Sequence, residues 1–195
     1  EECNVINCST IHPDKSIAYY ERLRECNINY LDAPVTGGTE GAKEGSLTML
    51  LGGEENVVKR SMPILNIIGK NIHYFGSAGN GQKVKAINQI LVAGSYAAVA
   101  EAMAVGKKLN LPMKEVVSAL STGAASSWAL KNRSQAMLSQ KYPLGFKLSL
   151  HNKDLEIALD IAKRIGIDLP ITSKVKSIEE RLIDRGYKDE DISVI

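Results

Sequence analysis

GNGQKVKAINQILVAGSYAAVAEAMAVGKK, residues 79–108, is the stretch that decides how this chain of 195 residues is organised. Its glycines favour a turn and oppose a helix, whereas apolar residues recur at helical spacing from Gln82 onward and predict one long helix. Lys85 is followed by Asn88 and Gln89 at positions that share one helix face with it. An ammonium and two amides on one face can bind a small, oxygen-rich molecule. Taken by itself, however, Lys85 is more simply explained as a surface lysine.

Upstream of this stretch the sequence alternates between strand and helix. The first strand is followed by Pro13, which is well placed to start a helix, and a second strand comes after that helix. This β-α-β order predicts parallel strands joined by a right-handed crossover. Ligands in open parallel sheets bind at the carboxyl ends of the strands. The predicted elements are strands at 4–8, 29–31, 46–51 and 72–75, and helices at 14–25 and 54–66, the second broken near Pro63.

Downstream of residue 108 the pattern is helical throughout. Helices are predicted at 113–121, 126–138, 150–165 and 171–184. Trp128 belongs either to the helical core or to a lid over the site, and its helical spacing in an apolar segment favours the core. The chain is therefore predicted to be α/β and then all-α, with one domain over residues 1–78 and a second over 79–195.

A glycine-rich segment, DAPVTGGTEG, follows the second predicted strand. Thr36, Gly37 and Gly38 should present backbone N–H groups at the start of a helix, where an anion such as a carboxylate can bind. The alternative is an ordinary glycine turn before a short helix. No Gly-Lys-Ser/Thr follows at the distance that a nucleotide P-loop requires.

Composition narrows the class of protein. A net charge of +2, without a basic run, argues against a nucleic-acid surface. The odd number of cysteines lacks paired metal spacing, which favours free, buried or half-buried thiols in a reducing compartment, and the scattered histidines propose no metal site. These cysteines are Cys3, Cys8 and Cys26.

Two further features bear on location. The chain opens with Glu1 and Glu2 rather than with the basic start of a signal peptide. The apolar run from 90 to 106 contains Glu101 and is rich in alanine and glycine, which favours a buried helix over a membrane span. We expect a cytoplasmic protein.

Four motifs in order over nearly the whole chain resemble those of the β-hydroxyacid dehydrogenase family, which includes 3-hydroxyisobutyrate dehydrogenase and tartronate semialdehyde reductase. STIHP at 9–13 looks like the cofactor-side strand end. DAPVTGG at 32–38 is similar to the substrate motif, with Thr36 in place of the usual serine. GNGQKVKAIN at 79–88 matches the catalytic pattern, and KDLEIAL at 153–159 looks like a late helix that contacts cofactor or substrate.

The resemblance implies a fold and a reaction. The fold would be the C-terminal half of a Rossmann-type domain followed by an all-helical domain like that of 6-phosphogluconate dehydrogenase. The reaction would be reversible hydride transfer between NAD or NADP and a small 3- or 2-hydroxy acid or its semialdehyde. Lys85 would donate the proton, which requires a lowered pKa. The implied substrate-binding residues are Thr36, Gly37, Gly38, Asn88 and, second to it, Gln89, and the implied cofactor-binding residues are Thr10 and Lys153.

One departure from the family pattern concerns the cofactor. The family begins with a strand and a Gly-x-Gly-x-x-Gly turn for the dinucleotide pyrophosphate, and this chain has no such turn. We therefore expect a fragment of an active enzyme that binds the dinucleotide poorly and is inactive by itself. The residue that selects NAD or NADP would lie in the absent part.

Two other functions stay open at this point. A chain without its pyrophosphate turn could be a non-catalytic dimerisation or scaffold module. A sugar-phosphate dehydrogenase of the 6-phosphogluconate type would need an arginine clamp, for which Arg133 alone offers little support. For each of these functions we expect the chain to associate with other copies of itself, as a homodimer or homotetramer. We expect it to bind neither nucleic acid nor a membrane.

Overall fold

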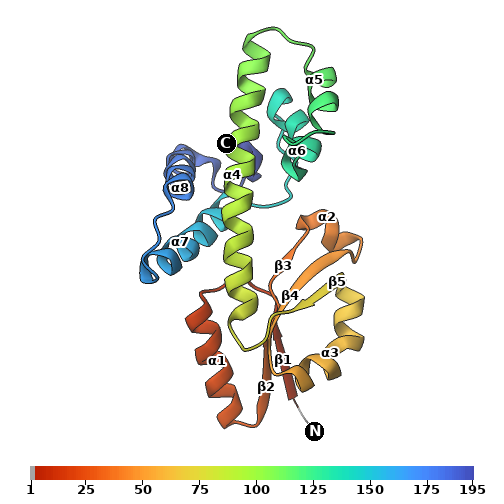
Figure 1. Ribbon diagram of the computed structural model, residues 1–195, viewed down its shortest axis with the longest axis vertical. Coiled ribbons are helices and arrows are strands. Elements are labelled where there is room, and N and C mark those ends of the chain that lie inside the picture. The colour runs from red at the N-terminus through yellow and green to blue at the C-terminus, as the bar shows by residue number, and fades with distance from the viewer. Residues whose placement is uncertain (1–2) are drawn as a thin grey trace. The chain divides into compact units, whose positions relative to one another are not determined.

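The chain folds into two compact units, Glu1–Asn88 and Gln89–Ile195. The computed structural model (Figure 1) describes residues 3–195, so the acidic start of the chain, Glu1 and Glu2, lies outside the described residues. The division falls inside the long helix α4, Asn80–Lys108, and the first turns of that helix belong with the sheet. The boundary predicted from the sequence, between residues 78 and 79, lies before this helix.

The first unit is a five-stranded mixed sheet in the order β1-β2-β4-β3, with β5 paired to β4. β1 and β2 pair in parallel from Cys3↔Ile28 to Asn7↔Asp32, which confirms the predicted β-α-β unit. β4 runs parallel to β5 and antiparallel to β2 and β3. The strands are β1 (Cys3–Asn7), β2 (Ile28–Asp32), β3 (Val35–Thr36), β4 (Leu47–Gly53) and β5 (Gly69–Tyr74), and the helices are α1 (Pro13–Glu25), α2 (Gly38–Lys43) and α3 (Glu55–Ile68).

The core of this unit lies between the sheet and α3. Leu31, Met49, Leu51 and Leu65 are fully buried there. α1 packs against β2, and Figure 1 shows α1 and α3 flanking the sheet. This is the partial Rossmann-type sheet that the family resemblance implied.

Two local predictions in this unit were wrong. α3 runs unbroken through Pro63, which lies on the exposed side of the helix, where water can bind the carbonyl that the proline leaves without an N–H donor. Cys3, Cys8 and Cys26 are free, as predicted, but they are exposed rather than buried.

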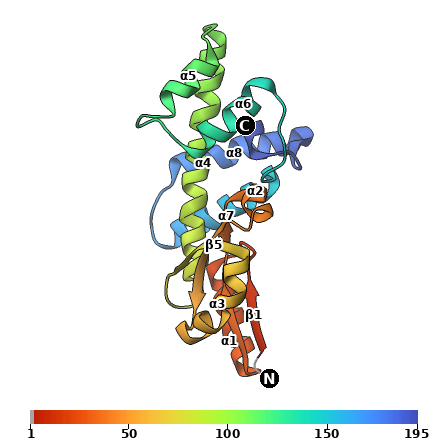
Figure 2. The same cartoon turned by 90° about the vertical axis from the view of Figure 1, so that its right-hand side faces the viewer.

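The second unit is helical. Its core is formed by the rest of α4 together with α6 and α7, through residues such as Tyr96, Met103, Leu130 and Leu148. Figure 2 shows α5 near the C-terminal end of α4. The helices are α5 (Met113–Leu120), α6 (Trp128–Ser139), α7 (Leu148–Arg164) and α8 (Pro170–Leu182), followed by the turns Ile183–Tyr187 and Ile192–Val194.

The expectation that Trp128 lies in the core was wrong. Its side chain is 50% exposed, and the Arg133 guanidinium stacks 4.7 Å from the centre of its ring. Trp128 is the first residue of α6, directly after Ser127, whose hydroxyl caps the helix by accepting from the N–H of Leu130. The buried side chains in the first turn of α6 are instead those of Ala129 and Leu130.

Candidate active site

The site in the first unit is built on Asp32, the last residue of β2. Its carboxylate is fully buried and accepts the N–H of Gly79 at 2.7 Å and the N–H of Gln82 at 3.0 Å. Both donors belong to the start of α4, where helical N–H groups lack partners within the helix. Burial raises the pKa of Asp32, and the N–H donors offset only part of that rise. Asp32 therefore fixes the first turn of α4 to the end of a strand.

Glycines allow α4 to approach the sheet closely. A Cβ atom on Gly81 would lie 2.2 Å from the Leu50 carbonyl oxygen and 2.7 Å from Asp32 Oδ2. A Cβ atom on Gly52, in β4, would lie 2.7 Å from Asp32 Oδ1. The glycines of the GNGQ motif thus serve the packing of helix on sheet.

Gln82 joins the start of α4 to the loop after β1. Its side chain is buried, donates from Nε2 to the Ser9 carbonyl oxygen at 2.8 Å and accepts the N–H of Ile11 at Oε1 at 3.1 Å. Thr10, a predicted cofactor-binding residue, lies between these two contacts and is half-buried. The carboxyl ends of β1 and β2 are therefore both held to the first turn of α4.

Lys85 lies one turn beyond Gln82 on the same helix. Its side chain is 7% exposed, whereas Lys83, Lys107 and Lys108 are exposed, as predicted for surface lysines. Asn88 follows a turn later and is half-buried. Burial singles out Lys85 among the lysines of this helix, because lysine is almost never fully buried without a partner.

The predicted carboxylate turn follows β3. Thr36 pairs with Thr48 of β4, and Gly37 and Gly38 come next, both exposed and with φ angles of 129° and 65°. Such positive φ values favour glycine. β4 connects this turn to α4, because it pairs with Thr36 near its start and approaches Gly81 through Leu50 at its middle.

The second unit contains the remaining predicted residues, Gln89 and Lys153. Gln89 is 1% exposed and donates from Nε2 to Asp154 Oδ2 at 2.8 Å. The Lys153 ammonium lies 2.9 Å from Asp154 Oδ1. Asp154 is buried at the interface of α4 and α7 and brings the two predicted residues together.

Two other buried ionic clusters lie in the helical unit. Arg133 and Asp191 form an ion pair, with Arg133 Nε 3.5 Å from Asp191 Oδ1. His151 Nδ1 lies 2.5 Å from Glu179 Oε1, and both side chains are buried. In residues 3–195, no three histidine, cysteine or acidic side chains are grouped to hold a metal ion.

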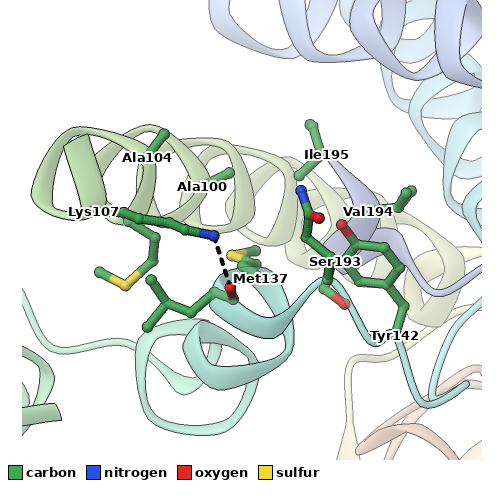
Figure 3. A pocket seen from close by; sticks show the side chains of 11 residues that line it. Ala100, Ala104, Lys107, Met137, Tyr142, Ser193, Val194 and Ile195 are labelled. Carbon is green, nitrogen blue, oxygen red and sulfur yellow. Dashed lines mark hydrogen bonds between the residues drawn. The ribbon is translucent and has the colours of Figure 1, made fainter. Parts of the chain in front are cut away.

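A cavity of about 280 Å³ also lies in the helical unit (Figure 3). Its lining includes Met103, Lys107, Tyr142 and Ser193, and the Lys107 ammonium donates to the Leu138 carbonyl oxygen at 3.2 Å. None of the predicted site residues lines this cavity.

Sequence reasoning missed Asp32, Gln82 and Asp154. Asp32 and Gln82 stand inside the DAPVTGG and GNGQ motifs, and Asp154 follows Lys153 in KDLEIAL. Each of the three is a carboxylate or an amide inside a motif, and this was the signal that could have identified it. The function of each motif had been assigned to neighbouring residues instead.

Two family models match the chain, one for each part. The NAD binding domain of 6-phosphogluconate dehydrogenase matches residues 1–76. The model described as NAD-binding of NADP-dependent 3-hydroxyisobutyrate dehydrogenase matches residues 79–195. The second match alone covers more than half of the chain.

Individual relatives agree with these models. The chain is 36% identical over 191 residues to 2-hydroxy-3-oxopropionate reductase of Escherichia coli, covering 98% of this chain and 65% of that protein. It is 33% identical over 198 residues to NAD-dependent L-serine dehydrogenase of Pseudomonas aeruginosa, covering 98% and 66%. The chain thus spans about two thirds of the length of these relatives.

A solved structure shares the fold. The crystal structure of 3-hydroxyisobutyrate dehydrogenase from Salmonella typhimurium superposes with a TM-score of 0.90 at 31% identity, over 98% of this chain and 67% of that one. The match covers both the partial Rossmann-type sheet and the helical second unit. The chain belongs to the 3-hydroxyisobutyrate dehydrogenase, or β-hydroxyacid dehydrogenase, family.

Proposed function

We propose that the protein interconverts a small 3- or 2-hydroxy acid and its semialdehyde by hydride transfer with NAD or NADP. The observation that carries the proposal is the burial of Lys85, 7% exposed, one turn after a helix start fixed by Asp32 and Gln82. A buried amine on a rigid helix suits general acid–base catalysis, because the helix holds the proton donor at a fixed position relative to a bound substrate.

The predicted substrate-binding residues and Lys85 would divide the work on the substrate. Thr36 and the N–H groups of Gly37 and Gly38 would bind the substrate carboxylate. Lys85 Nζ would give its proton to the carbonyl oxygen of the semialdehyde as hydride reaches the carbonyl carbon. In the reverse direction Lys85 would take the proton from the hydroxyl group. Asn88 would orient the substrate, with Gln89 second to it.

The fit to a dinucleotide is partial. The glycine cluster at the start of α4 is filled by Leu50 and Asp32, so Gly81 has no room for a pyrophosphate. Thr10, at the carboxyl end of β1, and Lys153, half-exposed beside Asp154, would face the cofactor instead. A bound nicotinamide would supply or accept the hydride. This chain by itself is expected to bind the dinucleotide poorly and to show no turnover.

The alternative is a non-catalytic dimerisation or scaffold module derived from the family. Against it stands the joint presence of Lys85, Asn88 and the Thr36–Gly38 turn, which folding does not require together. A sugar-phosphate dehydrogenase is disfavoured, because Arg133 is buried in an ion pair with Asp191.

The test is an activity assay of the product of the complete gene. NADH and NADPH would each be tried with tartronate semialdehyde, methylmalonate semialdehyde, glyoxylate and succinic semialdehyde. Turnover that is lost on Lys85→Ala would support the proposal and identify substrate and cofactor together. A folded, associating protein without turnover on any of these aldehydes would favour the scaffold function.

A further inference from the structure

The cavity of about 280 Å³ in the helical unit takes no part in the proposed hydride transfer. Apolar side chains from two helices form much of its wall, with Ala100 and Met103 on α4 and Met137 near the end of α6. Met103 is 3% exposed and belongs to the core of this unit. Methionine side chains are flexible and polarisable, so they adapt to apolar guests of different shape. The cavity is just below the size range in which proteins commonly bind small molecules.

Polar side chains line the same cavity, among them Lys107, Gln140 and Tyr142. Figure 3 shows Lys107 and Tyr142 on different sides of it. Within the described part of the chain, Lys107 is the one charged side chain in the lining. Its ammonium donates to the Leu138 carbonyl oxygen at 3.2 Å, which uses one of three N–H donors and leaves two for a bound group.

Gln140 has a backbone conformation that glutamine rarely adopts. It follows α6 with φ 55° and ψ 34°, in the left-handed region, where a helix that ends in this way usually has glycine. The N–H groups of Gln140 and Lys141 both donate to the Ala136 carbonyl oxygen, so the helix end is completed by backbone groups alone. What glutamine adds, and glycine would not, is an amide on the wall of the cavity. Backbone strain of this kind is common at binding sites.

Tyr142 adds a third donor. Its side chain is half-buried. Burial raises the pKa of its hydroxyl, and the nearby Tyr187 and Glu190 add to the rise, so the group keeps its proton at neutral pH. Ser193 also lines the cavity, but its hydroxyl already donates to Asp191 at 2.6 Å. The donors available to a guest are therefore an ammonium, an amide and a phenolic hydroxyl.

We infer that this cavity is a binding site for a small aliphatic carboxylate. The Lys107 ammonium would pair with the carboxylate, because a charge-assisted hydrogen bond is about twice as strong as a neutral one. Gln140 and Tyr142 would supply further donors. The aliphatic chain would pack against Met103 and Met137, out of contact with water. The inference does not depend on the proposed hydride transfer, so either can fail without the other.

The first test is NMR of the 195-residue chain with carbon-13 in its methionine methyl groups, titrated with hexanoate. Met103 and Met137 line the cavity, whereas Met49 is fully buried in the sheet unit and serves as an internal reference. The Met103 and Met137 signals should shift to saturation with a Kd of about 0.5 mM, as expected for a ligand of this size. The Met49 signal should not move.

The charge of the guest is tested with hexanol and hexylamine, which have the same aliphatic chain. Hexanol should bind about 10-fold more weakly than hexanoate, because it cannot form an ion pair. Hexylamine should not bind, because its charge has the same sign as that of Lys107. Binding of hexanol or hexylamine as tight as that of hexanoate would overturn a carboxylate as the ligand.

Two adjacent lysines test the ion pair. Lys107→Gln should weaken hexanoate binding about 10-fold and leave hexanol binding unchanged. Glutamine retains an N–H donor for the Leu138 carbonyl oxygen, and circular dichroism would check that the helices persist. Lys108→Gln is the matched control, because Lys108 is exposed and does not line the cavity. It should bind hexanoate as the natural chain does.

Gln140→Gly separates binding from stability. Glycine adopts the left-handed conformation without strain, so the variant should melt about 4 °C higher. Loss of the amide should weaken hexanoate binding about 3-fold. A variant that binds hexanoate as tightly as the natural chain would exclude Gln140 from the site.

Three results would overturn the inference as a whole. One is the absence of any shift of the Met103 and Met137 signals up to about 10 mM hexanoate, far above the expected Kd. Another is a shift of the Met49 signal as large as theirs, which indicates non-specific binding. The last is an equal loss of hexanoate binding, or no loss, in Lys107→Gln and Lys108→Gln.

Discussion

Asp32 in the sheet unit and Asp191 in the helical unit are both fully buried, yet they are stabilised in different ways. Asp191 accepts the N–H groups of Gly145 and Phe146, each at 2.9 Å, and the N–H and hydroxyl of Ser193. Arg133 supplies a counter-charge 3.5 Å away. Asp32 accepts the N–H groups at the start of α4, and in the described part of the chain no cation pairs with it.

The two aspartates therefore have different roles: Asp191 holds segments of the helical unit together, whereas Asp32 positions the start of α4. Asp191 joins three segments of the helical unit around a neutralised ion pair, an arrangement whose removal leaves a buried cation behind. Only backbone dipoles stabilise the Asp32 carboxylate, and its pKa is raised. Burying this carboxylate therefore costs more free energy for each contact that it makes. What Asp32 achieves is a fixed first turn of α4, the turn that precedes Lys85.

The largest expected effect is that of Asp191→Ala. It should lower the free energy of unfolding of the helical unit by about 4 kcal/mol, because Arg133 would stay buried without its counter-charge. Urea unfolding followed by the fluorescence of Trp128, the chain's only tryptophan, would measure this. Asp189→Ala is the control, since that exposed carboxylate pairs with Lys147 at the surface and its removal should change the stability far less than Asp191→Ala. Equal effects would remove the distinction between the two aspartates.

Gly81→Ala should destabilise the sheet unit by about 3 kcal/mol. Its new methyl group would overlap the Leu50 carbonyl oxygen, which belongs to β4 and cannot rotate away. Amide hydrogen exchange in β4 and in the start of α4 would report the change.

Gly94→Ala is the control for that experiment, because its methyl group would meet nothing within 4 Å. It should be neutral or should stabilise by up to about 1 kcal/mol, as expected for alanine in a helix. Loss of protection in Gly94→Ala as large as in Gly81→Ala would show that the close approach to β4 is not the cause.

Asp32→Asn should cost about 2 kcal/mol, less than Asp191→Ala. Gly79 and Gln82 donate to different carboxylate oxygens, and asparagine replaces one of these with an NH2 group. One of the two N–H groups therefore loses its acceptor, but no buried cation is left behind and the cost of burying a charge disappears. Hydrogen exchange of the β2 amides would give the opening free energy. A loss greater than that of Asp191→Ala would mean that Asp32 contributes more to cohesion than its surroundings indicate.

The smallest effect is a pH dependence. The pKa of Asp32 is raised above its ordinary value of 3.8, so the folded state binds its proton more readily than the unfolded state does. This contribution to stability is fully present below pH 3.8 and is lost as pH rises through the raised pKa. The stability of the natural chain relative to Asp32→Asn should therefore fall as pH rises through that window. A relative stability that stays constant or rises would contradict the raised pKa.

Local patterns were sufficient for the main elements of the fold. The alternation of strand and helix identified the parallel β1-β2 pair, and the period of apolar residues identified α4. The contrast between Lys85 and the exposed lysines of the same helix was also predicted, although only with the help of the family motifs.

Long-range and very short features were not predictable in this way. Asp32 meets its donors 47 and 50 residues further along the chain, a distance over which periodicity carries no information. β3 has only two residues, too few for a period to be seen. The unbroken α3 depends on which side of the helix Pro63 occupies, and that side is set by packing on the sheet.

The central claim is that Lys85, held by the fixed start of α4, is the proton donor of a hydride-transfer enzyme. The most direct test compares Lys85→Ala with Lys83→Ala in the product of the complete gene, on whichever semialdehyde is turned over. Lys83 is exposed two residues away on the same helix and donates to Asn80. We predict that Lys85→Ala lowers kcat about 1,000-fold while Lys83→Ala retains activity. Equal activity of the two folded variants would contradict the claim.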